Sequence, residues 1–377
     1  MKITEVRALG LRGATPEGGW SAEIAPDDCV HTLIEVCTDE GLTGLGSVFT
    51  SVALVEASLQ VLRPLYLGES AIEPERVSEK LHQHTFWQGR GGAITHTIGG
   101  IDIALWDIFG QVTGQPISRL LGGRYRERIR PYASLLMTEP AALAAHLDQI
   151  KAQGFRAFKI GWGPFGRVDD HLDEAIVRAA REAIGPDCAL MVDAGGSDAY
   201  WRGDLKWALR TAHMLAAYGV AWFEEALPPD DLEGYVQLCR LSPVPIAGGE
   251  VLTRRQSFQP WLRQGALDIV QPDVTKVGGI SEERRIAWMA AEQNILFVPH
   301  GWNTAIGLAA DLQLVAAVAG ARWVEYLTGS PYIDDLVAEP WRLDGDGMLA
   351  IPDRPGLGIT LNPDAVERYS GRRLKGA

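Results

Sequence analysis

ILFVPHGWN, residues 295–303, places a histidine directly behind what looks like a short buried strand. Four apolar residues precede Pro299, and five of the nine residues are β-branched, aromatic or proline. This composition predicts a strand that stops at Pro299. His300 is then either a capping or core histidine, which is the simpler interpretation, or a reactive group presented at the end of the strand. The rest of the chain decides between the two.

The sequence from about Arg130 onward repeats one pattern, a short apolar run followed by an amphipathic stretch. The predicted strands are Tyr132–Leu136, Ala157–Ile160, Ala189–Val192, Ala221–Phe223, Val244–Ala247, Ile269–Gln271, Ile295–Pro299 and Trp323–Tyr326. Helical stretches such as Ala141–Gln153 and Asp170–Ile184 separate most of them. Eight such units over about 200 residues predict a (β/α)8-type barrel.

The first part of the chain has a different order, with strands before helices. Strands are predicted at Ile3–Leu11, Thr32–Thr38 and Leu42–Phe49, and helices at Ser51–Leu62, Glu75–Thr85 and Thr95–Thr113. This order predicts a small α+β domain over residues 1–125, followed by the barrel over residues 126–340. The turn-rich segment 341–377 is expected to pack back on the first domain.

Polar residues lie at or just beyond the ends of the predicted barrel strands, from the second strand onward. They are Lys159, Asp193, Glu224, Glu250, Asp273, His300 and Glu325, spaced 23 to 34 residues apart. Because the C-terminal ends of barrel strands share one rim, where the active sites of such barrels lie, we expect these side chains to converge there.

Three of these residues are carboxylates on successive strands. Asp193, Glu224 and Glu250 would repel one another without a cation, whereas Mg²⁺ accepts such hard oxygen ligands together with water and substrate. Any one of them could instead cap a helix. The three together predict one Mg²⁺ per active site.

Asp273 and His300 lie on adjacent predicted strand ends. A carboxylate bonded to one ring nitrogen fixes the tautomer of a histidine and raises its basicity, so His300 is a candidate general base or acid. Lys159 has a simpler alternative role as a rim lysine whose ammonium group reaches water. The other seven histidines are interpreted as surface or packing residues, with His82, His84 and His96 as weak exceptions.

Composition limits the class of protein. A net charge of −13 argues against nucleic acid and anionic membrane as partners, but not against a small anionic substrate. No uncharged apolar stretch of about 18 residues predicts a transmembrane helix, and the polar start does not resemble a signal peptide. The cysteines, Cys29, Cys37, Cys188 and Cys239, show no metal-like spacing, so we expect reduced thiols and a cytoplasmic location.

Taken in order, these motifs resemble the enolase superfamily, and specifically its mandelate racemase-like group. The resemblance rests on GGIDIALWDIFGQVTGQPISRLLGG (99–123), VDAGG, WFEEAL, AGGE, QPDVTKVGG, VPHGWN, RWVEYL and PDRPGLGI (352–359). It implies a (β/α)7β barrel with an α+β capping domain formed by the N-terminal part and the C-terminal tail. It also implies Mg²⁺ on Asp193, Glu224 and Glu250, an Asp273–His300 dyad, and a Glu325 that hydrogen-bonds the substrate carboxylate.

Two positions depart from the family pattern. The family's second barrel strand usually ends Lys-x-Lys, and here an ungapped alignment gives Lys159 and then Gly161, so the second lysine, a base, is missing. A two-residue gap would instead make Lys159 that base. Gly195 stands where the family often has Asn. Both glycines are expected to enlarge the pocket on the Lys159 side.

The resemblance implies removal of the proton α to a carboxylate, through an enediolate. An intact dyad beside a depleted lysine motif favours dehydration of a sugar acid, an aldonate or aldarate, to a 2-keto-3-deoxy acid. Lys276 keeps a racemase, epimerase or cycloisomerase as the alternative, because relatives carry an opposite-face lysine there. A non-catalytic relative that keeps the fold and the metal is a further alternative.

Specificity is expected to come from two loops of the capping domain, Gly13–Asp28 and Val48–Val52. Trp20 in the first loop, and Trp162 and Trp302 at the barrel mouth, are the candidate substrate-binding residues. Relatives are commonly dimers or octamers, so a homo-oligomer is expected.

Overall fold

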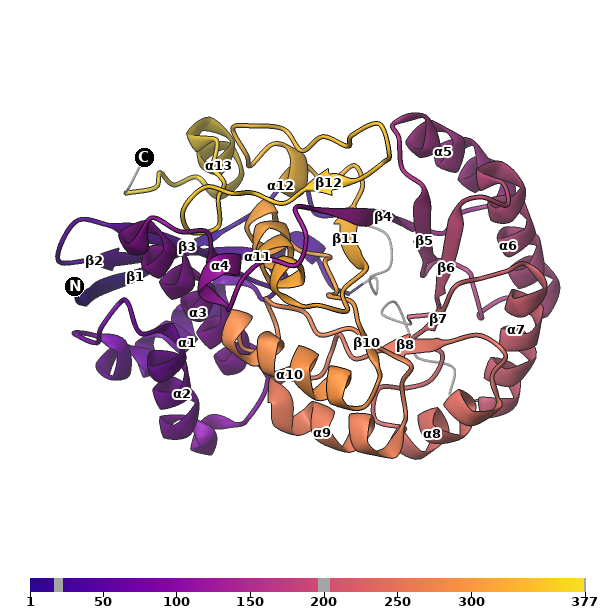
Figure 1. Cartoon of the computed structure of the whole chain (residues 1–377), viewed down its shortest axis with the longest axis horizontal. Helices are drawn as coiled ribbons and strands as arrows, with labels where there is room; N and C mark the ends of the chain where they lie inside the picture. The colour runs from indigo at the N-terminus through magenta and orange to yellow at the C-terminus, as the bar shows by residue number, and fades with distance from the viewer. Residues whose placement is uncertain (17–22, 196–203, 376–377) are drawn as a thin grey trace.

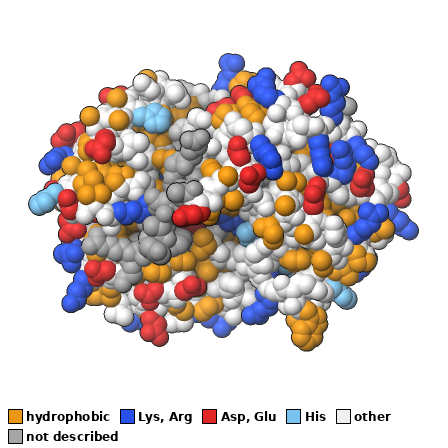
Figure 2. Space-filling model, turned by 180° about the vertical axis from the view of Figure 1, so that it is seen from behind, with side chains coloured by type: hydrophobic (Ala, Val, Ile, Leu, Met, Phe, Trp, Pro, Cys, Tyr) orange, Lys and Arg blue, Asp and Glu red, His pale blue; other side chains and the backbone are white. Residues whose placement is uncertain are grey.

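A computed structural model describes residues 1–16, 23–195 and 204–375. Figure 1 shows a ring of strands enclosed by helices on one side and a small sheet covered by helices on the other. Among the described residues, no helix is both long enough and apolar enough to cross a bilayer. On the face shown in Figure 2, Lys and Arg side chains are interspersed with Asp and Glu side chains.

The capping domain is built on an antiparallel sheet of order β1-β2-β3. Its strands are β1 (Ile3–Gly10), β2 (Thr32–Thr38) and β3 (Thr43–Val48), and its helices are η1 (Pro26–Asp28), α1 (Val52–Tyr66), α2 (Pro74–His84), η2 (Phe86–Gln88), α3 (Gly92–Thr113) and α4 (Ile117–Leu120). A Cβ at Gly44 or Gly46 would collide with the backbone of α3, at Ala104 and Gly100 respectively. The alternating glycines of β3 therefore let α3 lie directly on the sheet.

The second sheet is parallel and runs in the order β10-β9-β8-β7-β6-β5-β4-β11. Its strands are β4 (Arg128–Leu136), β5 (Ala157–Gly161), β6 (Ala189–Asp193), β7 (Phe223–Glu224), β8 (Ile246–Gly248), β9 (Ile269–Val270), β10 (Leu296–Phe297) and β11 (Trp323–Leu327). Its helices are α5 (Pro140–Ala152), α6 (Asp170–Ile184), α7 (Leu205–Ala217), α8 (Leu232–Leu241), α9 (Arg254–Gln264), α10 (Ile280–Glu292) and α11 (Ala305–Ala317). The helices form an outer ring, as Figure 1 shows.

The predicted barrel of eight parallel strands with an α+β cap is confirmed. Several strands are shorter than predicted, and β10 covers only two residues. The strand direction nevertheless continues to His300, which forms a parallel bridge with Asp273. Beyond it, the Gly301 N–H donates to Glu325 Oε2 at 2.7 Å, which joins the end of β10 to β11.

A short helix and the C-terminal tail follow the last barrel strand. After β11 comes α12 (Pro331–Asp334), then β12 (Leu349–Ala350), which pairs antiparallel with β4, and α13 (Pro363–Ser370). The tail returns to the capping domain, where α13 lies beside β1. The Arg12 N–H donates to the Tyr369 carbonyl at 2.9 Å, and the Ile117 N–H donates to the Gly356 carbonyl at 3.1 Å.

Candidate active site

The three predicted metal ligands meet at the C-terminal rim of the barrel. Asp193 and Glu224 end β6 and β7, and Glu250 lies two residues beyond β8. One carboxylate oxygen from each lies within 4.8 Å of the others, and all three side chains are buried. Burial and the neighbouring Glu224 raise the pKa of Asp193 well above its usual value. Three buried oxygen donors this close fit a divalent cation, which would offset their repulsion.

Lys159 lies between these ligands and β11. Its ammonium contacts Glu224 Oε1 at 2.6 Å, Glu325 Oε1 at 3.0 Å and Asp193 Oδ2 at 3.5 Å. Burial alone would lower its pKa, but Glu224 and Glu325 outweigh burial, so the pKa of Lys159 is raised well above its usual value. The ammonium is therefore held in its charged form at the centre of the site.

Glu325 is surrounded by hydrogen-bond donors. Its Oε2 accepts from the Tyr132 hydroxyl at 3.1 Å and from the Gly301 N–H at 2.7 Å, while its Oε1 faces Lys159. Burial would raise its pKa, but Lys159 and His300 lower it below its usual value. An ionised Glu325 is an acceptor only. In this arrangement Glu325 orients Lys159, and its hydrogen bond to a substrate carboxylate stays a prediction.

The dyad is assembled as the sequence suggested. His300 Nδ1 lies 2.7 Å from Asp273 Oδ2, and Asp273 Oδ1 accepts from the Thr275 N–H at 2.7 Å and the Thr275 hydroxyl at 2.6 Å. Asp273 is thereby fixed, and its pKa is lowered because these donors, with Lys276, outweigh burial. Burial would lower the pKa of His300, but Glu250, Asp273 and Glu325 raise it well above its usual value.

The second ring nitrogen of His300 faces the metal ligands. Nε2 lies 3.0 Å from Glu250 Oε2, although this oxygen has no hydrogen bond of ordinary geometry to a described residue. Lys276 contacts the other oxygen of Glu250 at 3.2 Å and lies 3.8 Å from Asp273. Because Lys276 and His300 share these two carboxylates, Lys276 lies beside the histidine and not across the site from it.

Two indoles cover the site. The rings of Trp162 and Trp302 stack with centroids 4.3 Å apart, and both line a cavity of only about 20 Å³ beside Lys159 and His300. A Cβ at Gly195 would lie 2.5 Å from Trp162 Nε1. The expectation that the glycines enlarge the pocket is therefore wrong at this position, because Trp162 occupies the space that a larger side chain at 195 would need. Trp20 lies outside the described residues.

Three polar side chains that support the site were missed. Glu224 Oε2 accepts from Trp222 Nε1 at 2.9 Å and from Gln271 Nε2 at 2.8 Å, and Tyr132 pairs with Glu325 in the ladder between β4 and β11. Trp222 and Gln271 each lie two residues before a predicted site residue, which puts them on the same face of the strand. A search for hydrogen-bonding side chains two positions before each predicted site residue would have found both.

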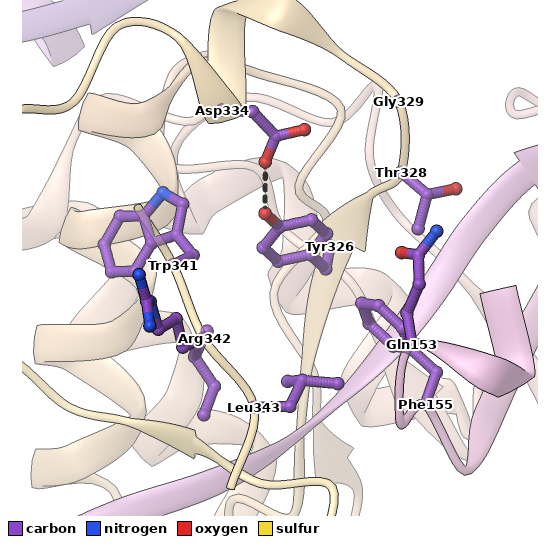
Figure 3. A pocket seen from close by; sticks show the side chains of 10 residues that line it. Gln153, Phe155, Tyr326, Thr328, Gly329, Asp334, Trp341, Arg342 and Leu343 are labelled. Carbon is purple, nitrogen blue, oxygen red and sulfur yellow. Dashed lines mark hydrogen bonds between the residues drawn. The ribbon is translucent and has the colours of Figure 1, made fainter. Parts of the chain in front are cut away.

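A larger cavity, of about 480 Å³, lies away from this chemistry (Figure 3). It is lined by Phe155, Tyr326, Asp334 and the tail residues Trp341 and Arg342, among others, and Tyr326 donates to Asp334 at 2.5 Å. None of the predicted site residues lines it. The strand-end cluster, despite its small cavity, is the candidate active site.

Comparisons with known proteins match nearly the whole chain. Residues 27–122 match the family model of the mandelate racemase / muconate lactonizing enzyme N-terminal domain, and residues 142–365 match that of the enolase C-terminal domain-like family. The chain is 34% identical to a D-galactarolactone cycloisomerase of Agrobacterium fabrum, over 98% of this chain and 99% of the relative. It is 30% identical to an L-rhamnonate dehydratase of Saccharopolyspora erythraea, over 98% of both. A racemase of Streptomyces coelicolor, crystallised with bound magnesium, superposes with a TM-score of 0.86 at 31% identity, over 98% of this chain and 99% of that one.

Proposed function

Because the chain belongs to the mandelate racemase / muconate lactonizing enzyme family of the enolase superfamily, we propose that it removes the proton α to the carboxylate of a sugar acid and expels the β-oxygen. Dehydration to a 2-keto-3-deoxy acid is the leading form of this reaction. The observation that carries the proposal is the single Asp273–His300 dyad. Beside it lies Lys159, whose ammonium is already paired with Glu224 and Glu325.

Asp193, Glu224 and Glu250 would hold the Mg²⁺ of this site, since they offer the only such cluster of three ligands among the described residues. When bound, the cation supplies positive charge against the negative charge that develops on the substrate carboxylate.

Lys159 supports the reaction as a cation. An ammonium with carboxylates at 2.6 and 3.0 Å is a poor base, since removing its proton would leave those carboxylates without compensation. We therefore assign Lys159 a contact with the substrate carboxylate, which corresponds to the ungapped alignment of the second strand. Glu325 and Tyr132 keep its side chain in place.

His300 carries both proton transfers. Its Nε2 takes the α-proton, and the C–H electron pair forms the enediolate. The β C–O bond then breaks, and Nε2 returns the proton to the departing hydroxyl, which leaves as water, while the enol product becomes the 2-keto-3-deoxy acid. Asp273 holds Nδ1–H throughout, so that Nε2 is the nitrogen that exchanges protons. Glu250 raises the pKa of His300, so the contact between Nε2 and Glu250 must part and Nε2 must lose its own proton before this step.

A cycloisomerase is the second candidate, and the similarity to the D-galactarolactone cycloisomerase favours it. The proton steps are the same, but the leaving β-oxygen belongs to a ring, so that no water is released. A racemase or epimerase would need a second base on the opposite face of the substrate carbon. Lys276 is badly placed for that role, because it lies beside His300.

Trp162 and Trp302 form the apolar roof over the substrate in this proposal. A cavity of about 20 Å³ holds no sugar acid, so the stacked indoles must separate to admit one. Trp20 remains a candidate for the same role.

The test is a screen of aldonic acids, aldaric acids and their lactones with the Mg²⁺-loaded enzyme in D₂O, followed by proton NMR. A new 3-deoxy methylene signal from an open-chain acid establishes dehydration, and the same signal from a lactone alone establishes cycloisomerisation. Exchange of the α-proton without any such product would contradict the elimination step.

A further inference from the structure

His31 is an anomaly of the capping domain. Its side chain is 1% exposed, and neither ring nitrogen has a hydrogen-bond partner among the described residues. Its φ of 40° lies in the left-handed region, which residues other than glycine rarely adopt. Buried polar groups are normally paired, so an imidazole that the described residues leave unpaired points to a partner beyond them.

The position of His31 links the cap to the barrel rim. Its ring packs edge-on against Phe49 and Tyr332, with centroids 5.4 and 5.3 Å away. The Lys276 ammonium lies over the face of the Phe49 ring, with Nζ 4.3 Å from the ring centroid. The Phe49 N–H donates to the Thr275 carbonyl at 3.4 Å. His31 is therefore separated from the strand end that bears Asp273 and Lys276 by one aromatic ring.

The first capping loop joins the same junction. The Ala14 N–H donates to the Tyr332 hydroxyl at 3.1 Å, and Tyr332 lies in α12 directly after β11. His31 thus stands where both capping loops and the last barrel strand meet. On this side the cap meets the barrel rim, at the strand end that bears Asp273 and Lys276.

The chemistry of the ring limits what it can bind. Burial lowers the pKa of His31 to about 4, so the imidazole is neutral near pH 7, with one donor and one acceptor nitrogen. A hydroxyl group, which also donates and accepts, matches this pair. A second carboxylate matches it less well, because a neutral ring cannot balance its charge, and Asp273 and Asp27 add negative charge nearby that Lys276 offsets in part.

We propose that His31 is a specificity-determining residue, whose imidazole exchanges hydrogen bonds with a hydroxyl group at the end of the substrate remote from the reacting carboxylate. This inference rests on the proposed function and narrows it to aldonates, which end in a hydroxymethyl group, over aldarates, which end in a second carboxylate.

His96 provides a matched control. It is a partly buried histidine of the same junction, but its Nδ1 lies 2.7 Å from the Thr50 hydroxyl and 3.2 Å from the Phe49 carbonyl. Its ring is thus bonded within the protein. A change at His96 should lower stability without changing the choice of substrate.

The experiment compares acids that differ only at the remote end: D-galactonate with D-galactarate, D-gluconate with D-glucarate, and D-mannonate with D-mannarate. Turnover and calorimetric binding to the Mg²⁺-loaded enzyme are both measured, for the wild type, His31→Gly, His31→Asn and His96→Gln. Glycine relaxes the positive φ and opens a space for free imidazole, and asparagine tolerates the same backbone while keeping a donor and an acceptor.

The wild type should prefer the aldonate of its best pair by about 2- to 10-fold, the range that corresponds to one net hydrogen bond. His31→Gly should lose this preference, mainly through KM, added imidazole should restore it, and His31→Asn should keep part of it. Preference for the aldarate, binding of none of the acids, or a preference that survives in His31→Gly would overturn the inference. Acids that bind with the expected preference but show no α-proton exchange would refute the proposed function alone.

Discussion

Replacing Lys159 with methionine should destabilise the metal-free protein by about 3–5 kcal/mol, the usual consequence of removing one partner from a buried ion pair. The Lys159 side chain is 3% exposed, and its ammonium faces Glu224, Glu325 and Asp193 at 2.6, 3.0 and 3.5 Å. Methionine fills a similar volume without the charge. The buried carboxylates then repel one another with no cation among them.

The expected thermal shift follows from the size of the chain. With 377 residues and about 2.1 cal/mol/K of unfolding entropy per residue, the loss corresponds to a fall in Tm of roughly 4–6 °C. Saturating Mg²⁺ should make the loss smaller, because the cation would neutralise the Asp193 and Glu224 carboxylates that Lys159 otherwise compensates.

Urea unfolding of the wild type and Lys159→Met, with Mg²⁺ and with chelator, measures both effects. Lys206→Met is the control, since Lys206 is exposed on α7, and it should change the free energy of unfolding by less than about 0.5 kcal/mol. A loss below about 1 kcal/mol at Lys159, or one that Mg²⁺ leaves unchanged, would refute the reasoning that this ammonium compensates the metal ligands.

Three further results are expected. Burial raises the pKa of Asp102 to about 7, so its proton is kept on folding at pH values where the unfolded chain has lost it. The free energy of unfolding should therefore fall by about 3 kcal/mol from this group as the pH rises from 4 to 7, and urea titrations of Asp102→Asn that show the same slope would contradict this. Gly195→Asn should cost about 1–3 kcal/mol by overpacking, and pairing it with Trp162→Ala should recover part of that cost, whereas strictly additive losses would show that the two side chains do not compete. Mg²⁺ at 100 times its Kd should raise the free energy of unfolding by about 2.7 kcal/mol, and chelator should reverse the gain.

The residues at the strand ends could be predicted from the sequence because their spacing along the chain is enough to place them on one rim. Strands spaced by one βα unit place their last residues on one rim, so Asp193, Glu224 and Glu250 could be grouped without coordinates. The Asp273–His300 pair follows from the same spacing. Strand lengths were less accessible, since β9 and β10 cover two residues each and their apolar runs extend beyond the hydrogen-bonded ladder.

Other features depend on packing that the sequence does not encode locally. Trp162 has a φ of 60° and lies over Gly195, 33 positions later in the chain, so the small residue accommodates an indole and does not widen the pocket. Glu325 is contacted by three donors from three separate segments, namely Tyr132, Lys159 and Gly301. Neither arrangement has a periodic signature in the sequence.

The most direct test of the central claim is the exchange of the substrate α-proton in D₂O, measured by NMR for the wild type and His300→Asn with an accepted sugar acid. Magnesium binding is followed by calorimetry in parallel. If His300 moves the proton, exchange should fall by at least about 100-fold in the variant, while magnesium binding stays within a few-fold of the wild-type value. Exchange at the wild-type rate in His300→Asn would contradict the assignment of His300 as the base.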